Sequence, residues 1–135
     1  MNIGEKFYCS RCLTELIEEE HCLKCGYSSF SQSDELALEE GTTLKNMRFH
    51  IGAVRKKLKH GYVYGAFDYI NQKPVYIFEY FPAFTIGRDS ESETVVIVPE
   101  NLEIEFENGK AKIKAGLSSH HKAFAENNTL YVFRP

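Results

Sequence analysis

The residues best suited to chemistry in this chain are its four cysteines. They form two Cys-x-x-Cys pairs, Cys9 with Cys12 and Cys22 with Cys25, and nine residues separate the pairs. A gap of two residues suits a turn in which both thiolates point at one tetrahedral metal ion. Four thiolates fill the coordination sphere of Zn²⁺ and leave no position for a reactive water. We therefore expect one structural zinc ion at this site and no catalysis by it.

Other uses of these cysteines need a different setting. Two disulfides are typical of secreted chains, and a redox dithiol is typical of a thioredoxin-like βαβ pattern. The N-terminal residues lack the apolar core of a signal peptide, and no such pattern surrounds the cysteines. His21 is a further potential ligand, although the four cysteines already complete the site.

A small ribbon must position the metal. We predict that residues 1–27 form a zinc ribbon in which a short hairpin over residues 13–21 joins the two cysteine turns. A unit of this size buries little apolar surface, so metal binding would supply most of its folding free energy. Residues 28–42 are rich in serine and then acidic, which predicts a linker.

The rest of the chain, residues 43–135, has the pattern of a mainly β domain. Aromatic and β-branched runs alternate with turn residues along it. Residues 74–81 have almost no polar face, so we expect this strand to be covered on both sides. The expected strands span residues 47–55, 62–69, 74–81, 122–125 and 129–133.

A further β-hairpin is predicted over residues 102–115. Its centre is Asn108-Gly109, a pair that suits a type I′ turn. In that register Glu103 faces Lys114, two more Glu-Lys pairs follow toward the turn, and the opposite face is apolar.

Composition and charge exclude some classes of protein. The formal net charge of −3 argues against non-specific binding to nucleic acid or to an acidic membrane surface. The sequence contains no run of about 18 apolar residues, so we expect no transmembrane helix. A cytoplasmic location is the expectation that remains.

One basic cluster stands out against this acidic background. It lies at a loop predicted over residues 56–61, between the first two strands. The cluster is suited to an anion or an acidic partner, and lysines at a hairpin tip also protect a sheet edge from aggregation. Its candidate contact residues are Arg55, Lys56, Lys57, Lys59 and His60.

Several strings of residues resemble one protein family. Residues 75–82 read Val-Tyr-Ile-Phe-Glu-Tyr-Phe-Pro, Arg88-Asp89 follows, and Gly41-Thr42 and Arg48-Phe49 precede the first strand. With a final hairpin at residues 124–133, these strings resemble the N-lobe of bacterial serine/threonine protein kinases that carry an N-terminal zinc ribbon. The resemblance covers about half of the chain and implies an antiparallel kinase N-lobe-like sheet.

The resemblance also predicts a lobe without nucleotide chemistry. The places of the three glycines of the phosphate-binding loop hold Lys56, Leu58 and Gly61. Phe78 stands where the phosphate-pairing lysine belongs, and Tyr76 replaces the small alanine that leaves room for adenine.

Two larger parts of a kinase are also expected to be missing. The predicted hairpin takes the place of helix αC with its paired glutamate, and the lobe with the catalytic aspartate would follow Pro135. We therefore expect a pseudokinase-like chain that binds no ATP and is not an enzyme.

The expected function is a non-catalytic protein-interaction or regulatory module, with another protein as its partner. One alternative is a nucleic-acid-binding zinc-ribbon protein that uses residues 55–60, although nucleic acid is an unlikely partner for an acidic chain. A second alternative is a phosphopeptide-binding forkhead-associated-like domain. It rests on Ile86-Gly87-Arg88 and on residues 118–121, Ser-Ser-His-His.

Overall fold

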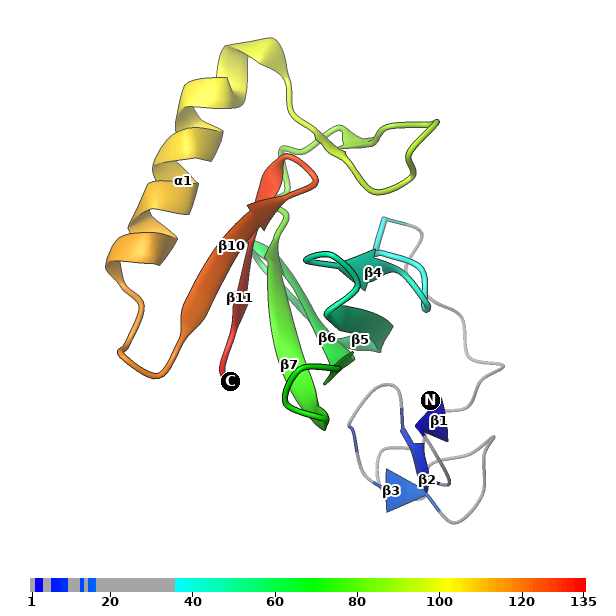
Figure 1. The fold of residues 1–135 in the computed structure, drawn as a ribbon. Helices are drawn as coiled ribbons and strands as arrows, with labels where there is room; N and C mark the ends of the chain where they lie inside the picture. Colours follow the sequence, from blue (N-terminus) through cyan, green and yellow to red (C-terminus); the bar gives the residue numbers. More distant parts are fainter. Residues whose placement is uncertain (1, 4–5, 10–12, 14, 17–35) are drawn as a thin grey trace.

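The computed structural model describes residues 2–3, 6–9, 13, 15–16 and 36–135 (Figure 1). Its main body is a six-stranded antiparallel sheet in the order β10-β11-β7-β6-β5-β4. The expectation of a mainly β antiparallel domain is therefore confirmed. The strands of this sheet are β4 (Thr43–Leu44), β5 (Phe49–Leu58), β6 (Gly61–Asp68), β7 (Lys73–Tyr80), β10 (Lys122–Glu126) and β11 (Thr129–Phe133).

Strands β5, β6 and β7 form a meander with short turns. Lys59 and His60 alone connect Leu58 to its cross-strand partner Gly61, so most of the loop expected over residues 56–61 is strand. Gly61 is required here because a Cβ on it would lie 1.9 Å from the carbonyl oxygen of Glu79. The side-chain-free position lets the tip of the hairpin lie close against β7.

The turn after β6 is held by the buried carboxylate of Asp68. This carboxylate accepts two hydrogen bonds from Arg48, both of 3.0 Å. It also accepts the backbone N–H of Ile70 at 3.0 Å and the side-chain amide of Asn71 at 3.0 Å. The contacts fix the β6–β7 turn to the start of β5, where Arg48 lies.

Both faces of β7 are covered, as the sequence pattern predicted, except at Tyr76. Val75, Ile77 and Glu79 are buried on one face, and Tyr80 is buried on the other. Tyr76 retains 46% of its surface. The core that surrounds this strand is largely aromatic, and its largest fully buried side chains are Tyr62, Tyr64, Tyr131, Phe49, Phe106 and Phe133.

The prediction of a β-hairpin over residues 102–115 is wrong. These residues form a 3-10 turn, η1 (Glu100–Leu102), followed by the helix α1 (Glu103–Ala115). α1 lies between β7 and β10 in the chain, and it runs along one side of the sheet (Figure 1). A helix therefore stands where the hairpin was expected to replace helix αC.

Helical spacing explains why this segment is not a hairpin. Phe106 is buried, while Leu102, Gly109, Ile113 and Leu117 are half-buried, and the residues between them are mostly exposed. Steps of three, four and seven residues put these side chains on one face of a helix. The helix buries this face against Tyr80 and Phe84, whose rings contact Phe106 edge-on.

The charges that suggested cross-strand pairs fit the helix equally well. Glu103 and Glu105 lie in its first turn, and Lys112 and Lys114 lie in its last turn. That arrangement complements the positive N-terminus and negative C-terminus of a helix. Glu107 and Lys110 form an ion pair of 2.8 Å along its surface.

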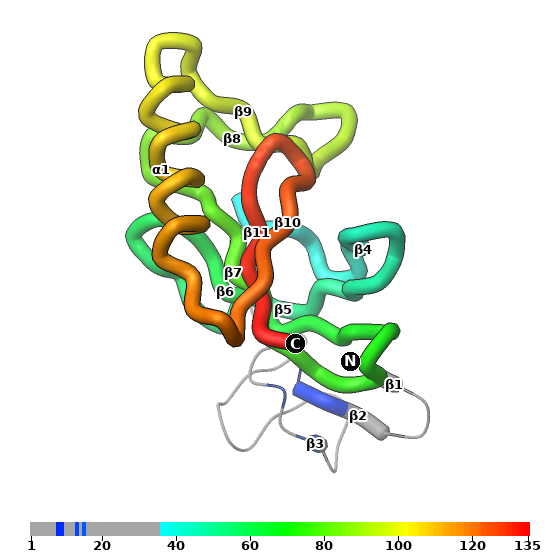
Figure 2. Tube along the Cα trace, turned by 60° about the vertical axis from the view of Figure 1, so that its left-hand side comes forward, coloured from blue at the N-terminus to red at the C-terminus, as the bar shows by residue number. Residues whose placement is uncertain are grey.

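Residues 36–42 and the antiparallel pair of β8 (Gly87–Arg88) with β9 (Val96–Ile97) lie on the face of the sheet that carries Glu79. Figure 2 shows β8 and β9 near the N-terminal end of α1. Ala37 and Leu38 are buried in the same core, so residues 36–42 pack against the sheet although they fall in the range expected to be a linker. Residues 28–35 lie outside the described residues.

The described N-terminal residues form a small sheet of their own. β1 (Asn2–Ile3), β2 (Lys6–Tyr8) and β3 (Glu15–Leu16) pair antiparallel in that order. Among the described residues, no helix is both long and apolar enough to cross a membrane.

Candidate interaction surface

A hollow of about 480 Å³ lies where the β5–β6 hairpin, β7 and α1 meet. We call it the α1 hollow. Its apolar surface comes from Leu58, Phe78, Tyr80 and Ile113, and Gly109 adds helix backbone without a side chain. The residues that line it are Leu58, Lys59, His60, Phe78, Tyr80, Gly109, Lys112 and Ile113.

Gly109 sets the distance between the helix and the sheet. A Cβ on this residue would lie 1.9 Å from the hydroxyl oxygen of Tyr80. Tyr80 is buried and its ring packs edge-on against Phe106 at 5.1 Å, so it has little room to move away. The tyrosine therefore lies directly against the helix backbone and forms one wall of the α1 hollow.

The rim of the α1 hollow is basic. Lys59 and His60 come from the hairpin turn and Lys112 comes from α1, and none of the eight lining residues is acidic. The other predicted contact residues, Arg55, Lys56 and Lys57, are exposed on β5 rather than in a loop. The ammonium group of Lys57 lies 5.6 Å from the centre of the Tyr62 ring.

Strand β7 and helix α1 meet in the α1 hollow through apolar side chains. The half-buried ring of Phe78 lines the α1 hollow together with Ile113 of the helix. An aromatic ring from the sheet and an aliphatic side chain from the helix thus form one apolar surface. Leu58 pairs with Gly61, and Gly61 pairs with Tyr80. The three strands β5, β6 and β7 therefore stay paired up to the turn at Lys59 and His60.

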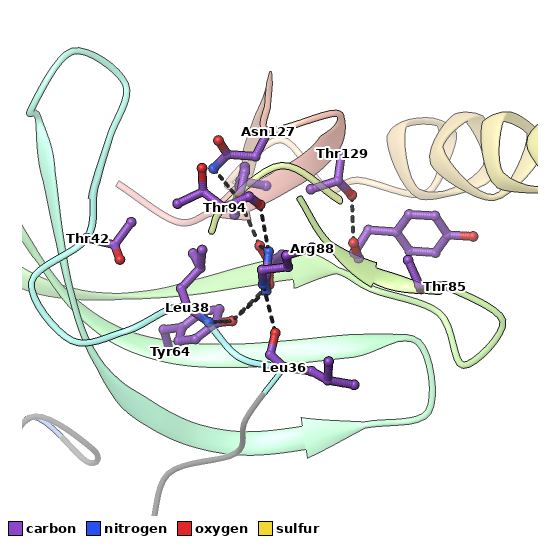
Figure 3. A network of polar contacts seen from close by, with 12 residues as sticks. Leu36, Leu38, Thr42, Tyr64, Thr85, Arg88, Thr94, Asn127 and Thr129 are labelled. Atoms are coloured by element: carbon purple, nitrogen blue, oxygen red, sulfur yellow. Dashed lines mark hydrogen bonds and ion pairs between the residues drawn. The ribbon is translucent and has the colours of Figure 1, made fainter. Parts of the chain in front are cut away.

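A separate polar network lies inside the sheet (Figure 3). The fully buried carboxylate of Glu79 accepts two hydrogen bonds from Arg88, at 2.6 and 3.0 Å. It also accepts the hydroxyl groups of Tyr64 at 2.8 Å and Tyr131 at 2.7 Å. Arg88 further donates to the carbonyl oxygens of Leu36 and Thr94, at 2.8 and 2.9 Å.

The electrostatics of this network favour neutral phenol groups on Tyr64 and Tyr131 and a charged guanidinium on Arg88. Burial, reinforced by the charge of Glu79, raises the pKa of both Tyr64 and Tyr131 well above the ordinary value for a phenol. Burial alone would lower the pKa of Arg88, but its bonds to Glu79 outweigh that effect and raise it. The network therefore joins β6, β7, β11, β8 and Leu36 as a structural unit.

Arg88 and residues 118–121, Ser-Ser-His-His, make separate sets of contacts. The Arg88 guanidinium is bound to Glu79 within the fold. The Ser118 hydroxyl lies 2.7 Å from Nδ1 of His121 and also accepts the backbone N–H of His120, in an exposed turn. These contacts give no support to the forkhead-associated-like alternative.

One of the four predicted zinc ligands lies within the described residues. Cys9 is buried, with 1% of its surface exposed. Its carbonyl oxygen accepts the backbone N–H of Leu13 at 2.9 Å, and Leu13 has a left-handed φ of 65°. Cys12, Cys22 and Cys25 lie outside the described residues, so the zinc site stays a prediction.

Comparisons with known proteins give one structural neighbour at the level of fold. No protein-family model matches the chain, and no curated protein matches it. A solved structure, the apo form of PpkA-294, is similar with a TM-score of 0.61 and 23% identity, over 73% of this chain and 38% of that one. This likeness supports a kinase-like fold for the chain, and the matched part spans well under half of PpkA-294.

Two of the eight residues that line the α1 hollow, Lys59 and His60, belong to the contact residues predicted from the sequence. Sequence analysis assigned Lys112 and Ile113 to a strand and so could not place them beside the hairpin turn. The spacing of Phe106, Gly109 and Ile113 was the signal that could have found the helix. The buried pairing of Glu79 with Arg88 gave no signal in a single sequence.

Proposed function

We propose that this chain is a non-catalytic protein-interaction or regulatory module, stabilised by one zinc ion, whose kinase-like sheet binds a protein and not a nucleotide. The observation that carries the proposal is Phe78. It occupies the lysine position of the kinase resemblance, and its ring helps to line the apolar α1 hollow. Because none of the described residues that line this apolar hollow offers a carboxylate to hold Mg²⁺, the hollow suits a protein partner better than it suits Mg²⁺-ATP.

The remaining polar groups support the same proposal. The carboxylate that follows Phe78, Glu79, is fully buried and is bound by Arg88, Tyr64 and Tyr131. Asp68 is likewise engaged by Arg48 and the β6–β7 turn. Each buried acid thus stabilises the fold, and neither is left to bind a metal–nucleotide complex.

A nucleotide test addresses the first half of the proposal. The full-length, zinc-loaded chain is titrated with ATP and Mg²⁺ and followed by thermal shift and by calorimetry. We expect no change in Tm and no heat of binding. Binding at millimolar or lower ATP would overturn the absence of nucleotide binding.

A partner test addresses the second half. The tagged chain is used to capture proteins from a lysate of its own organism, and the captured protein is then purified and mixed with the chain to measure a Kd. We expect a defined complex that survives nuclease treatment. A complex that nuclease abolishes would favour nucleic-acid binding, and the absence of any purified complex would overturn the proposal.

A further inference from the structure

The α1 hollow combines an apolar floor with a basic rim. Its floor is aromatic and aliphatic, from Phe78, Tyr80, Ile113 and Leu58. Leu58, at the end of β5, keeps 38% of its surface exposed and so offers apolar area to a partner. Burial of such apolar groups by a partner is favourable by about 25 cal/mol per Å² of apolar area removed from water.

Charge around the α1 hollow restricts the kind of partner. Lys59, His60 and Lys112 surround the apolar floor, and the exposed Lys56, whose partner Val63 pairs with Phe78, extends the basic surface along β5. The chain as a whole carries a formal net charge of −3, so this basic surface is a local departure from the overall charge. A local basic rim attracts acidic segments and disfavours basic ones.

A nucleic acid would use this surface poorly. Its phosphates would meet the lysines, but the floor is recessed between α1 and the hairpin, and aliphatic groups from Leu58 and Ile113 form part of it. An apolar side chain matches that floor, and carboxylates on either side of it match the rim. The volume of about 480 Å³ is within the range of about 300–1,000 Å³ typical of sites that bury a whole ligand group.

We propose that the α1 hollow binds an acidic segment of the partner protein by enclosing one large apolar side chain, which acidic residues flank on both sides. The apolar side chain is the anchor that supplies most of the affinity, in the way that few residues dominate an interface. The flanking carboxylates meet Lys59, His60 and Lys112 and speed association. This inference rests on the proposed function and names the chemistry of its partner.

Selection from a library of random peptides displayed on phage, with the full-length zinc-loaded chain as bait, tests the inference. The expected consensus is one aromatic or large aliphatic residue flanked by Asp or Glu. Changing that apolar residue to Ala should weaken binding of the synthetic consensus peptide at least about tenfold. A consensus that lacks the apolar residue or the acidic flanks, or a selection that enriches no peptide, would overturn the inference.

Variants of the chain locate the binding site of the consensus peptide. Leu58→Glu and Ile113→Asp each place a carboxylate in the floor from a different element, so loss of binding in both is not explained by damage to one element. Each should weaken peptide binding at least about tenfold, and Lys112→Glu should weaken it and reduce its salt dependence. Lys73→Glu, an exposed charge reversal at the opposite end of β7, is the matched control and should leave the Kd unchanged.

The outcome for the natural partner separates this inference from the proposed function. A captured partner that binds the wild-type chain, Leu58→Glu and Ile113→Asp with equal affinity would overturn the inference and leave the interaction module intact. Failure to obtain any partner, with a consensus peptide still bound at the α1 hollow, would instead count against the proposed function.

Discussion

The guanidinium of Arg88 and the carboxylate of Glu79 form a double hydrogen bond, at 2.6 and 3.0 Å, between residues nine positions apart in the chain. Both side chains are buried, with exposures of 7% and 0%. In the kinase resemblance these two residues belong to the strings 75–82 and 88–89. Their pairing gives those strings a physical role that does not involve nucleotide.

Removing one partner of this buried pair should strongly destabilise the sheet. Glu79→Gln keeps the shape but leaves Arg88 as a buried charge without its counter-ion. We expect the free energy of unfolding to fall by about 3–5 kcal/mol, measured by urea unfolding followed by circular dichroism. Replacing both residues by Met should recover part of that loss, because no charge then remains buried.

The exposed ion pair on α1 provides the control for that measurement. Glu107→Gln removes the 2.8 Å pair with Lys110, in which Glu107 is largely exposed. Pairs of this kind contribute roughly 0.2–0.5 kcal/mol in a helix. An equal loss of stability in Glu79→Gln and Glu107→Gln would contradict the structural role assigned to the buried pair.

Gly109→Ala should destabilise the chain, although alanine normally stabilises a helix. The new Cβ would lie 1.9 Å from the Tyr80 hydroxyl oxygen, and the buried tyrosine would have to shift. We expect a loss of about 1–3 kcal/mol, typical of an overpacked core, measured by thermal unfolding. Tyr80→Leu in the same chain should relieve the clash.

Gly116→Ala is the matched control for that variant. The nearest atom to a Cβ at residue 116 is 3.4 Å away, and its φ of −90° suits any residue. Its stability should stay close to that of the wild-type chain. If Gly109→Ala proved as stable as Gly116→Ala, the close contact between α1 and β7 would be wrong.

Acid should weaken the fold through Asp68. Burial alone would raise the pKa of this carboxyl, but hydrogen bonds from Arg48 and from the backbone N–H groups of Asn71 and Ile70 outweigh burial and lower it. A carboxyl with a lowered pKa in the folded state stabilises the protein above the pKa of the unfolded state, about 3.9 for Asp. That stabilisation is lost as the pH falls through the lower, folded-state pKa.

The corresponding variant is Asp68→Asn. It should be less stable at neutral pH, and its free energy of unfolding should change less steeply between neutral pH and about pH 2 than that of the wild-type chain. Urea unfolding at a series of pH values measures both effects. The exposed Glu91→Gln serves as a control, and identical pH profiles for Asp68→Asn and the wild-type chain would refute the prediction.

Zinc removal should unfold the N-terminal residues and spare the sheet. The buried residues of the main core all lie at or beyond Ala37, so the sheet has a core of its own. Treating the chain with a chelator should broaden or shift the amide NMR signals of residues 7–27, while the signals of β5, β6 and β7 persist. Simultaneous loss of both sets would show that the N-terminal residues stabilise the sheet.

Strand positions could be predicted because each strand carries its own local pattern. The expected strand over residues 129–133 matches β11 in full, and residues 74–81 differ from β7 by a single position at each end. Turn residues at 71–72 and 127–128 separate these runs, and predicting such turns needs no information from distant residues.

The helix could not be predicted from charge and turn chemistry alone. Asn108-Gly109 and the Glu-Lys order satisfy a type I′ hairpin, but they equally satisfy a helix with acids in its first turn and bases in its last. The deciding contribution is tertiary, since Phe106 is buried against Tyr80 and Phe84. The α1 hollow depends on that packing, so its composition also lay beyond local patterns.

Strand order in the sheet also determines when its contacts can form. β5, β6 and β7 are consecutive hairpins, whereas β11 pairs with β7 across a long intervening segment, with Tyr131 facing Glu79 at 52 residues' separation. Closing that longer loop costs more chain entropy, so we expect the meander to form early in folding and the C-terminal hairpin to dock late. Tyr131→Phe should then accelerate unfolding more than it slows folding. We therefore expect the last strand to control how long the folded state persists and not how fast it forms.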